Sequence, residues 1–319
     1  MTAKRIDIEA AAAFLTAHDG YTILSHANPD GDTAGCAYGL CRALRKMGKK
    51  ARVCCADPFS RRFSFMWEDL PEEDFTEETV ISVDVADSRL LGANKELYEG
   101  KIRLAIDHHV SHVDFAESLC LEPYASACGQ TIFKIVKAMG VPMDKDIAAC
   151  LYTAIVTDSG CFKFSSVTPE THMIAAELLA YDFGFSELNY ILFDLKTKER
   201  IALEETIYRN MKYYLDGQCA VIILPNSVLD TVDPEDSNGI SAIPRQIEGV
   251  EVGVVLKEKK DGSWKASLRA NSRADVQKIC SVFGGGGHAK AAGCSFTDCT
   301  AEQAIEKLIP AIKDALEVK

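Results

Sequence analysis

The chain has 319 residues, of which 47% are hydrophobic and 26% are charged, and its formal net charge is -12 at pH 7. This length allows two domains with a core each, and the ordinary composition excludes a disordered protein. The acidic net charge argues against a protein that binds duplex nucleic acid, because such a protein needs a basic face to contact the phosphates. It permits a small nucleotide as substrate.

Neither the N-terminus nor the cysteines point to a secreted or membrane-bound protein. No signal peptide is readable, and no apolar run approaches the length that spans a membrane. The twelve cysteines include no C-x-x-C pair, so we expect reduced, often buried, small apolar residues. We therefore expect a cytoplasmic protein without a membrane partner.

The first part of the chain alternates strand-like and helix-like stretches. A short apolar run at 21–25 predicts a buried strand, and 33–47 predicts a helix with Gly48 just past its end. Further apolar strands are expected at these positions: 51–55, 80–84 and 102–107. This rhythm predicts a parallel α/β sheet with helices on both faces, in which ligands gather beyond the carboxyl ends of the strands.

Helical periodicity dominates from residue 129 to 211, and a second unit begins near Asp216. Its elements are expected at these positions: a strand at 219–224, a hairpin formed by 250–257 and 263–270 around Asp261-Gly262, and a final helix at 301–316. We therefore predict an N-terminal domain at 1–185, a helical linker at 186–215 and a smaller C-terminal α/β domain at 216–319.

Acidic and imidazole side chains follow the predicted strands where each one ends. The first strand runs into HANPDGD (residues 26–32), another ends at Asp84, and a third reaches the Asp-His-His of residues 107–109. A later helical stretch leads into Asp158. Because parallel strands end at one edge of a sheet, these groups can converge, and a mixed Asp/His set suits divalent ions such as Mn²⁺. Two such ions, about 3.5–4 Å apart, stabilise the attacking and the leaving oxygen of an in-line displacement at phosphorus.

Each of these motifs also has an ordinary structural explanation when it is taken alone. Asp30-Gly31 is typical of a turn, Asp84 can cap a helix, and Asp158-Ser159-Gly160 is typical of a helix end. The recurrence of such motifs at successive strand ends favours a common site over three unrelated explanations.

HANPDGD, the strand end at Asp84, IDHH and TDSG resemble, in order and spacing, the four motifs of the DHH phosphoesterase family across residues 1–185. The resemblance implies two divalent ions, Mn²⁺ before others, with six ligands: His26 and Asp30 for one ion, Asp32, His108 and Asp158 for the other, and Asp84 between both. It also implies that His109 faces the substrate phosphate, where it neutralises charge or protonates the leaving oxygen. Asp107 would orient one of the imidazoles, and His112 receives no role.

A run of four glycines marks the C-terminal part, in FGGGGHAKAAGC (residues 283–294). Successive glycine N–H groups can form an anion nest, with His288 and Lys290 as added donors, although a bare glycine run is more often a flexible turn. The stretch SLRANSRADVQKICSVFGGGGHAKAAG resembles the DHH-associated C-terminal domain of the first type. That resemblance implies that a substrate phosphate is bound by these residues: Arg269, Gly285, Gly286, Gly287 and His288.

Together the two domains are similar to small bacterial members of the DHH family. This similarity implies a cleft between the domains and hydrolysis of short oligoribonucleotides to mononucleotides, or of 3′-phosphoadenosine 5′-phosphate to AMP. The expected partners are short single-stranded RNA or DNA oligonucleotides and small nucleotides, without duplex nucleic acid. A phosphodiesterase for linear or cyclic dinucleotides is the alternative, and a non-catalytic nucleotide sensor is a further one. The oligomeric state stays open, with a homodimer among the states allowed.

Overall fold

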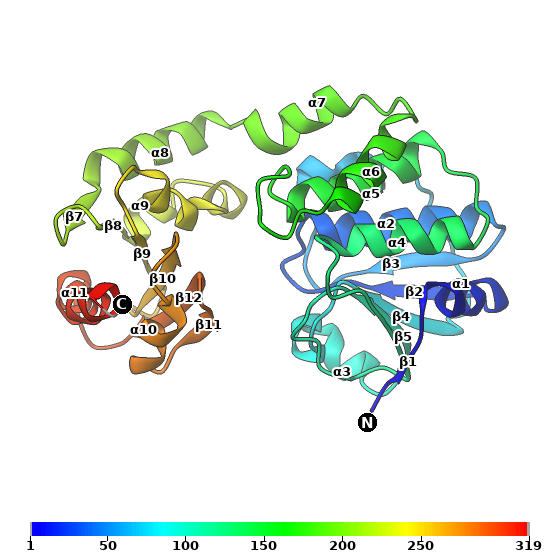
Figure 1. Ribbon diagram of the computed structural model, residues 1–319, viewed down its shortest axis with the longest axis horizontal. Helices are drawn as coiled ribbons and strands as arrows, with labels where there is room; N and C mark the ends of the chain where they lie inside the picture. The colour runs from blue at the N-terminus through cyan, green and yellow to red at the C-terminus, as the bar shows by residue number, and fades with distance from the viewer. Residues whose placement is uncertain (1, 318–319) are drawn as a thin grey trace. The chain divides into compact units, whose positions relative to one another are not determined.

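The computed structural model describes residues 2–317 and divides the chain into two compact units, which meet in sequence between Leu195 and Lys196 (Figure 1). Each unit, unit 1 before this point and unit 2 after it, combines one sheet with helices. This confirms the predicted α/β fold class, whereas the domain limits at 185 and 215 stay a prediction. Between residues 2 and 317, no helix is long and apolar enough to cross a membrane.

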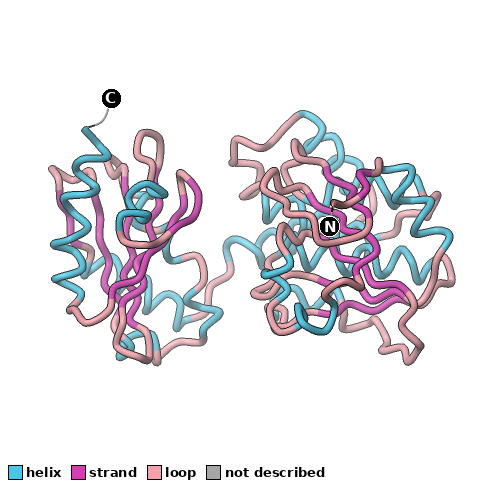
Figure 2. Tube along the Cα trace, turned by 90° about the horizontal axis from the view of Figure 1, so that it is seen from below, coloured by secondary structure: helices cyan, strands magenta, loops and turns pink. Residues whose placement is uncertain are grey.

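A six-stranded sheet with parallel pairing throughout forms the centre of unit 1, in the order β1-β6-β5-β4-β2-β3 (Figure 2). Its strands are β1 (Lys4–Arg5), β2 (Tyr21–Leu24), β3 (Ala51–Cys54), β4 (Thr79–Val83), β5 (Ile102–Asp107) and β6 (Ser118–Leu121). The four predicted strands are confirmed. Sequence reasoning missed β6 and also β1, which with two residues is too short to show a period.

The two faces of this sheet are covered unequally. The larger core joins one face to helices α1, α2, α4, α5 and α6, while the other face packs on the short α3 and the 3₁₀ turn η2. The helices are α1 (Ile8–Ala17), α2 (Gly31–Lys46), α3 (Asn94–Tyr98), α4 (Cys128–Ala138), α5 (Lys145–Asp158), α6 (Pro169–Leu179) and α7 (Phe185–Asn189). Shorter turns are η1 (Arg61–Met66), η2 (Ser88–Leu91) and the π-helical η3 (Tyr190–Asp194).

Helices α2 and α5 approach each other backbone to backbone. A Cβ built on Gly31 would lie 2.4 Å from the Thr157 side chain, and one on Gly35 would lie 2.3 Å from the Cys150 carbonyl oxygen. A Cβ on Gly39 would meet the Leu151 side chain at 2.9 Å. This stripe of three glycines, one per helical turn, makes the helices antiparallel neighbours, so the start of α2 lies beside the end of α5.

Unit 2 holds a mixed six-stranded sheet in the order β11-β12-β10-β9-β8-β7, in which only the β8–β9 pair is parallel. Its strands are β7 (Lys212–Tyr214), β8 (Cys219–Leu224), β9 (Val252–Glu258), β10 (Trp264–Ala270), β11 (Gly286–His288) and β12 (Ala291–Phe296). Its helices are α8 (Lys198–Asn210), α9 (Asn226–Leu229), α10 (Val276–Val282) and α11 (Ala301–Glu317), with 3₁₀ turns η4 (Pro234–Ser237), η5 (Ile240–Ala242) and η6 (Pro244–Gln246). Helices α10 and α11 pack on one face of the sheet, and α8 packs on the other.

The glycine stripe gives a test of the α2–α5 contact. We expect Gly35→Ala to lower the free energy of unfolding of unit 1 by about 1–3 kcal/mol, because its methyl group meets a backbone carbonyl that cannot move aside. The matched control is Gly39→Ala, whose methyl group meets the end of a flexible leucine and gains helix propensity. Urea unfolding followed by Trp67 fluorescence in a Trp264→Phe background measures unit 1 alone. Equal stability of the two variants would contradict the backbone contact.

Candidate functional site

His26, Asp30 and Asp84 form one set of side chains at the carboxyl ends of β2 and β4. His26 Nδ1 lies 2.9 Å from the Ala27 carbonyl oxygen, which accepts its proton and leaves Nε2 free as a ligand. That Nε2 lies 3.6 Å from Asp30 Oδ1 and 3.7 Å from Asp84 Oδ2. Asp30 also begins α2, because the same Oδ1 accepts the Asp32 and Thr33 N–H groups at 3.0 Å.

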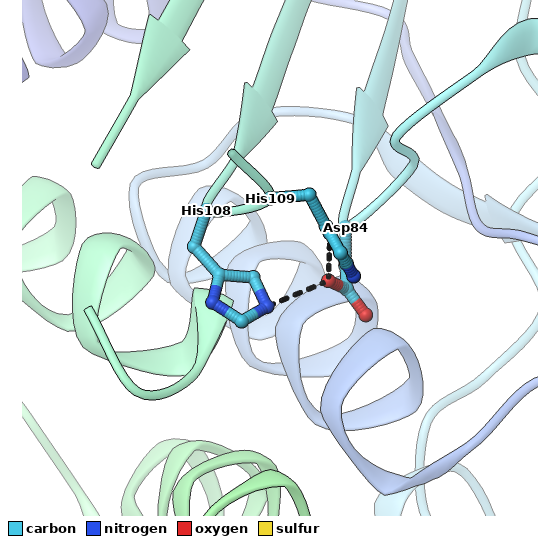
Figure 3. Close-up of side chains that lie close together, drawn as sticks. All are labelled: Asp84, His108 and His109. Carbon is cyan, nitrogen blue, oxygen red and sulfur yellow. Dashed lines mark ion pairs between the residues drawn. The ribbon is translucent and has the colours of Figure 1, made fainter. Parts of the chain in front are cut away.

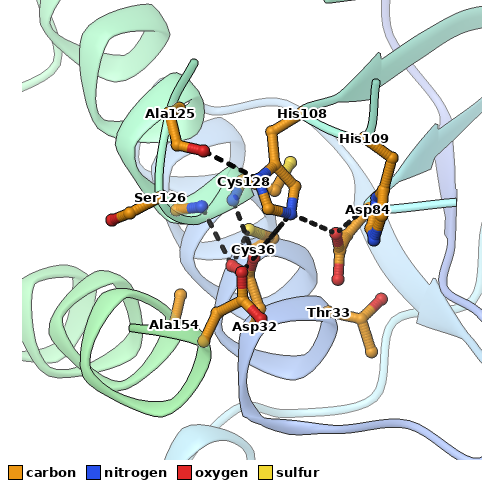
Figure 4. A network of polar contacts seen from close by, with 12 residues as sticks. Asp32, Thr33, Cys36, Asp84, His108, His109, Ala125, Ser126, Cys128 and Ala154 are labelled. Atoms are coloured by element: carbon orange, nitrogen blue, oxygen red, sulfur yellow. Dashed lines mark hydrogen bonds and ion pairs between the residues drawn. The ribbon is translucent and has the colours of Figure 1, made fainter. Parts of the chain in front are cut away.

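Asp32, His108 and Asp158 form a second set, drawn from the start of α2, the end of β5 and the end of α5. His108 Nδ1 donates to the Ala125 carbonyl oxygen at 3.0 Å, so its Nε2 faces the carboxylates (Figure 4). This Nε2 lies 3.7 Å from Asp32 Oδ2 and 3.5 Å from Asp158 Oδ2. The contact of α2 with α5 therefore brings the two carboxylates of this set to the same imidazole nitrogen.

The Asp32 carboxylate is held in place from several directions. It accepts the N–H groups of Cys128 at 2.7 Å and Gly129 at 2.9 Å, which lie at the N-terminus of α4. The Cys36 thiol donates to its Oδ1 at 3.2 Å and so supplies a further hydrogen bond (Figure 4). These bonds fix the orientation of Asp32 without any ion.

Asp84 lies between the two sets. Its Oδ1 is 3.6 Å from His108 Nε2 (Figure 3), while its Oδ2 faces His26. The residue is 2% exposed, and Oδ1 has no hydrogen-bond partner among the described residues. Its φ of 57° is in the left-handed region, which is strained for a residue with a side chain and is typical of functional sites.

The charges at this site are uncompensated. Burial, followed by the neighbouring carboxylates, raises the pKa of Asp32 and of Asp84 well above the ordinary value, and burial also raises the pKa of Asp158. Contacts of 3.5–3.7 Å are too long for hydrogen bonds, yet they suit two ligands that are each about 2.0–2.2 Å from a shared ion. The carboxylate and imidazole donors, with an unpartnered oxygen between them, therefore fit divalent metal ions.

Asp107 ends β5 and is fully buried beneath the site. Its Oδ1 accepts from His109 Nδ1 at 2.8 Å and its Oδ2 from His112 Nδ1 at 2.5 Å. Burial by itself raises the pKa of Asp107, but these two bonds outweigh burial and hold it below the ordinary value. The bond to Asp107 in turn raises the pKa of His109. Sequence reasoning missed the contact of His112, because nothing in the spacing shows that its ring turns back toward Asp107.

In unit 2, Arg269 and His288 lie in one row of the sheet, on strands β10 and β11, with Ala291 of β12 between them. Two strand spacings put their backbones about 10 Å apart. The Arg269 guanidinium donates to the Leu268 carbonyl oxygen at 3.0 Å, and no ion pair of Arg269 is found between residues 2 and 317. Burial and the neighbouring Arg245, a residue that sequence reasoning missed, lower the pKa of Arg269. An anion would relieve the repulsion between the two arginines.

The glycine run differs from the expected open nest. The N–H groups of Gly284 and Gly285 donate to the carbonyl oxygens of Ser281 and Cys280 and close helix α10. A Cβ on Gly285 would lie 2.2 Å from the Gly293 carbonyl oxygen, so close packing requires this glycine. Residues 286–288 form the outer strand β11. Only the outer edge of this strand therefore offers N–H groups to a phosphate.

Lys290 was expected to add a donor for the phosphate, but its ammonium group is already bonded. It donates to the Ser272 carbonyl oxygen at 2.6 Å and to that of Ala274 at 3.1 Å. Glu251 holds the same loop from the other side by accepting the N–H groups of Ser272 and Ala274, both at 2.9 Å. Both side chains therefore fix the loop that follows Arg269.

Comparison with known proteins identifies two matching families. The model for the DHH family, N-terminal domain, matches residues 21–155, and that for the DHHA1 domain matches residues 219–318. The bifunctional oligoribonuclease and PAP phosphatase NrnA of Thermus thermophilus is 31% identical over 304 residues, which cover 92% of this chain and 89% of that protein.

Two further proteins are similar over most of the chain. The crystal structure of an exopolyphosphatase-related protein from Bacteroides fragilis is 25% identical with a TM-score of 0.87, and it covers 96% of this chain and 95% of its own. The cyclic-di-AMP phosphodiesterase PdeA of Listeria monocytogenes is 23% identical over 97% of this chain, which spans 49% of that longer protein.

The uncompensated charge at Asp84 gives a metal-removal test. With metal stripped, we expect Asp84→Asn to raise the free energy of unfolding of unit 1 at pH 7 by about 1–2 kcal/mol, because it removes a buried carboxylate whose pKa is raised. Free Mn²⁺ at 100 times its Kd should stabilise the wild type by about 2.7 kcal/mol and the variant by much less. Trp67 fluorescence and metal analysis after dialysis measure both effects. Asp314→Asn, at an exposed position of α11, is the control, and equal Mn²⁺ uptake by Asp84→Asn would contradict the site.

Proposed function

This chain belongs to the DHH family of phosphoesterases, and we propose that it hydrolyses short oligoribonucleotides to mononucleotides and 3′-phosphoadenosine 5′-phosphate to AMP. The observation that carries the proposal is Asp84, whose two carboxylate oxygens face two different histidine-containing sets. The likeness to the NrnA enzyme over nine tenths of the chain supports this choice of substrates. Twelve free cysteines support a cytoplasmic location.

The six side chains have distinct roles in this proposal. His26 and Asp30 would hold one divalent ion, Asp32, His108 and Asp158 would hold a second, and Asp84 would be a ligand shared by the two. Two ions bound there supply Lewis acidity at the phosphate and lower the pKa of water for in-line attack. Mn²⁺ is our first choice, because it accepts both carboxylate oxygens and imidazole nitrogens.

His109 is the proposed catalytic imidazole. Its Nδ1 is bonded to Asp107, which fixes the ring and leaves Nε2 for the substrate. Its side chain is 42% exposed, whereas that of His108 is 12% exposed, so the two neighbouring histidines differ in access to a ligand. The raised pKa of His109 favours a protonated ring, which suits the stabilisation of charge on the phosphate or the protonation of the leaving oxygen.

Arg269 and His288, with the outer edge of Gly286 and Gly287 in β11, are the proposed phosphate-binding residues of unit 2, whereas the N–H group of Gly285 is used to close α10. A half-buried guanidinium without a carboxylate partner forms strong charge-assisted bonds to a phosphate. Arg245 is added to this set, because its charge acts on Arg269. Short RNA and DNA strands and small nucleotides all carry the phosphate that such a row binds.

A second substrate class, linear and cyclic dinucleotides, is favoured by the likeness to the PdeA enzyme. The same metal site would cleave these diesters, so the two proposals differ in substrate and share their chemistry. The higher identity to the NrnA enzyme, 31% against 23% for PdeA, supports the oligonucleotide proposal as the first choice.

We expect Mn²⁺-dependent hydrolysis of end-labelled RNAs that is fastest for the shortest, in a series from two to about twenty nucleotides. Asp84→Ala should abolish it, because it removes the oxygens that both ion sets share. Parallel reactions with 3′-phosphoadenosine 5′-phosphate, a linear dinucleotide and a cyclic dinucleotide rank the substrate classes. Absence of hydrolysis with every substrate, in protein shown to contain metal, would rule the proposal out.

Arg269→Ala should raise KM for a two-nucleotide RNA by about 10- to 100-fold, the cost of losing a charge-assisted hydrogen bond to a phosphate. We expect Arg245→Ala to raise KM less, since it acts beside the first arginine. Arg209→Ala, at an exposed position of α8 paired with Glu205, is the matched control. An unchanged KM for Arg269→Ala in steady-state kinetics would show that the phosphate binds elsewhere.

A further inference from the structure

We propose that His112 is a positioning residue. Its hydrogen bond fixes the orientation of the Asp107 carboxylate, and this carboxylate in turn fixes the His109 ring by a second hydrogen bond. The inference rests on the proposed function, because it assigns a role in the same hydrolysis. It concerns a residue outside both proposed metal-ligand sets.

The backbone brings His112 back toward the end of β5. Its N–H donates to the His109 carbonyl oxygen at 3.1 Å, which closes a turn after the strand. The ring then lies against Asp107, with Nδ1 at 2.5 Å from Oδ2. On its far side the ring stacks on Phe115, at 5.2 Å between ring centroids and 29° between planes. The imidazole is therefore wedged between an aromatic ring and the carboxylate.

The two oxygens of Asp107 have unequal partners. Oδ1 accepts His109 Nδ1 at 2.8 Å and the N–H groups of His108 at 2.7 Å and His109 at 3.2 Å. Oδ2 accepts only from His112 among the residues from 2 to 317. Asp107 is fully buried, so loss of the His112 donor would leave a charged oxygen without a partner. The carboxylate would then be free to turn, and its hydrogen bond to His109 would weaken.

The other ring nitrogen of His112 argues against a role in packing alone. Nε2 is buried and has no hydrogen-bond partner among the described residues, and the side chain is 1% exposed. An orphaned polar atom in the interior costs stability, which an apolar side chain of similar size would avoid. Such a cost is expected where orientation serves catalysis, and the His112 ring is joined to the proposed catalytic imidazole by two hydrogen bonds through Asp107.

The metal-binding side chains have anchors of their own. His108 is fixed by the Ala125 carbonyl oxygen, and Asp32 by the N–H groups of Cys128 and Gly129. A change at His112 should therefore leave metal and substrate binding in place and act on the chemical step through His109.

The test compares two variants of the full Mn²⁺-loaded chain on a two-nucleotide RNA. His112→Leu removes the donor, and we expect kcat to fall by about 10- to 100-fold, the usual effect of losing an outer partner, with KM and Mn²⁺ affinity within about threefold of the wild type. His112→Asn keeps an N–H donor near the same place and should recover most of kcat. If His112→Leu does not fold, His112→Met, which also lacks a donor but adapts to the gap, replaces it.

A double-mutant cycle isolates the path through His109. In a His109→Ala background, His112→Leu should cause little further loss of kcat, because the side chain that it positions is gone. Additive losses, an Asn variant as impaired as the Leu variant, or a Leu variant with wild-type kcat would each overturn the proposal. Failure of the wild type to hydrolyse any substrate would instead overturn the proposed function, so the two failures are distinct.

Discussion

Repulsion between buried carboxylates is the constraint on which the architecture of unit 1 depends. Asp32 and Asp84 are 1% and 2% exposed, and Asp30 and Asp158 act on them from nearby. A buried carboxylate stays ionised only beside cations. In this fold the carboxylates lie at the ends of strands and helices, where imidazole side chains can join them as ligands of a cation. The carboxylates are held in fixed positions against their repulsion by three features: the parallel strands, the N-terminus of α4 and the α2–α5 contact.

The two units carry opposite local charge, which the net charge of -12 conceals. Unit 1 gathers carboxylates that need cations, whereas the row that contains Arg269 in unit 2 has cations that need an anion. Divalent ions would satisfy the first kind of site, and a phosphate group would satisfy the second. An acidic protein can therefore bind a strongly anionic substrate without the broad basic surface that a duplex requires.

The sequence predicted what lies directly after the buried apolar strands β2, β4 and β5. His26, Asp84 and His108 were found in this way, because a buried parallel strand is readable and its end fixes the edge of the sheet. The short or glycine-rich strands β1, β6, β7, β11 and β12 were missed, since they show no period. Contacts that depend on side-chain direction, such as those of Lys290 and His112, were equally out of reach.

The glycine stripe of α2 has a consequence for ionic radius. Gly35 packs against the Cys150 carbonyl group of α5 and Gly31 packs against the Thr157 side chain, so the helix ends that carry Asp32 and Asp158 are held at a close, fixed spacing. Ca²⁺ needs oxygen ligands at about 2.3–2.6 Å, whereas Mg²⁺ takes about 2.0–2.1 Å. A gap that cannot widen favours the smaller ions. In the proposed metal site, glycines that contact no ion would thus limit the size of the ion that the two carboxylates accept.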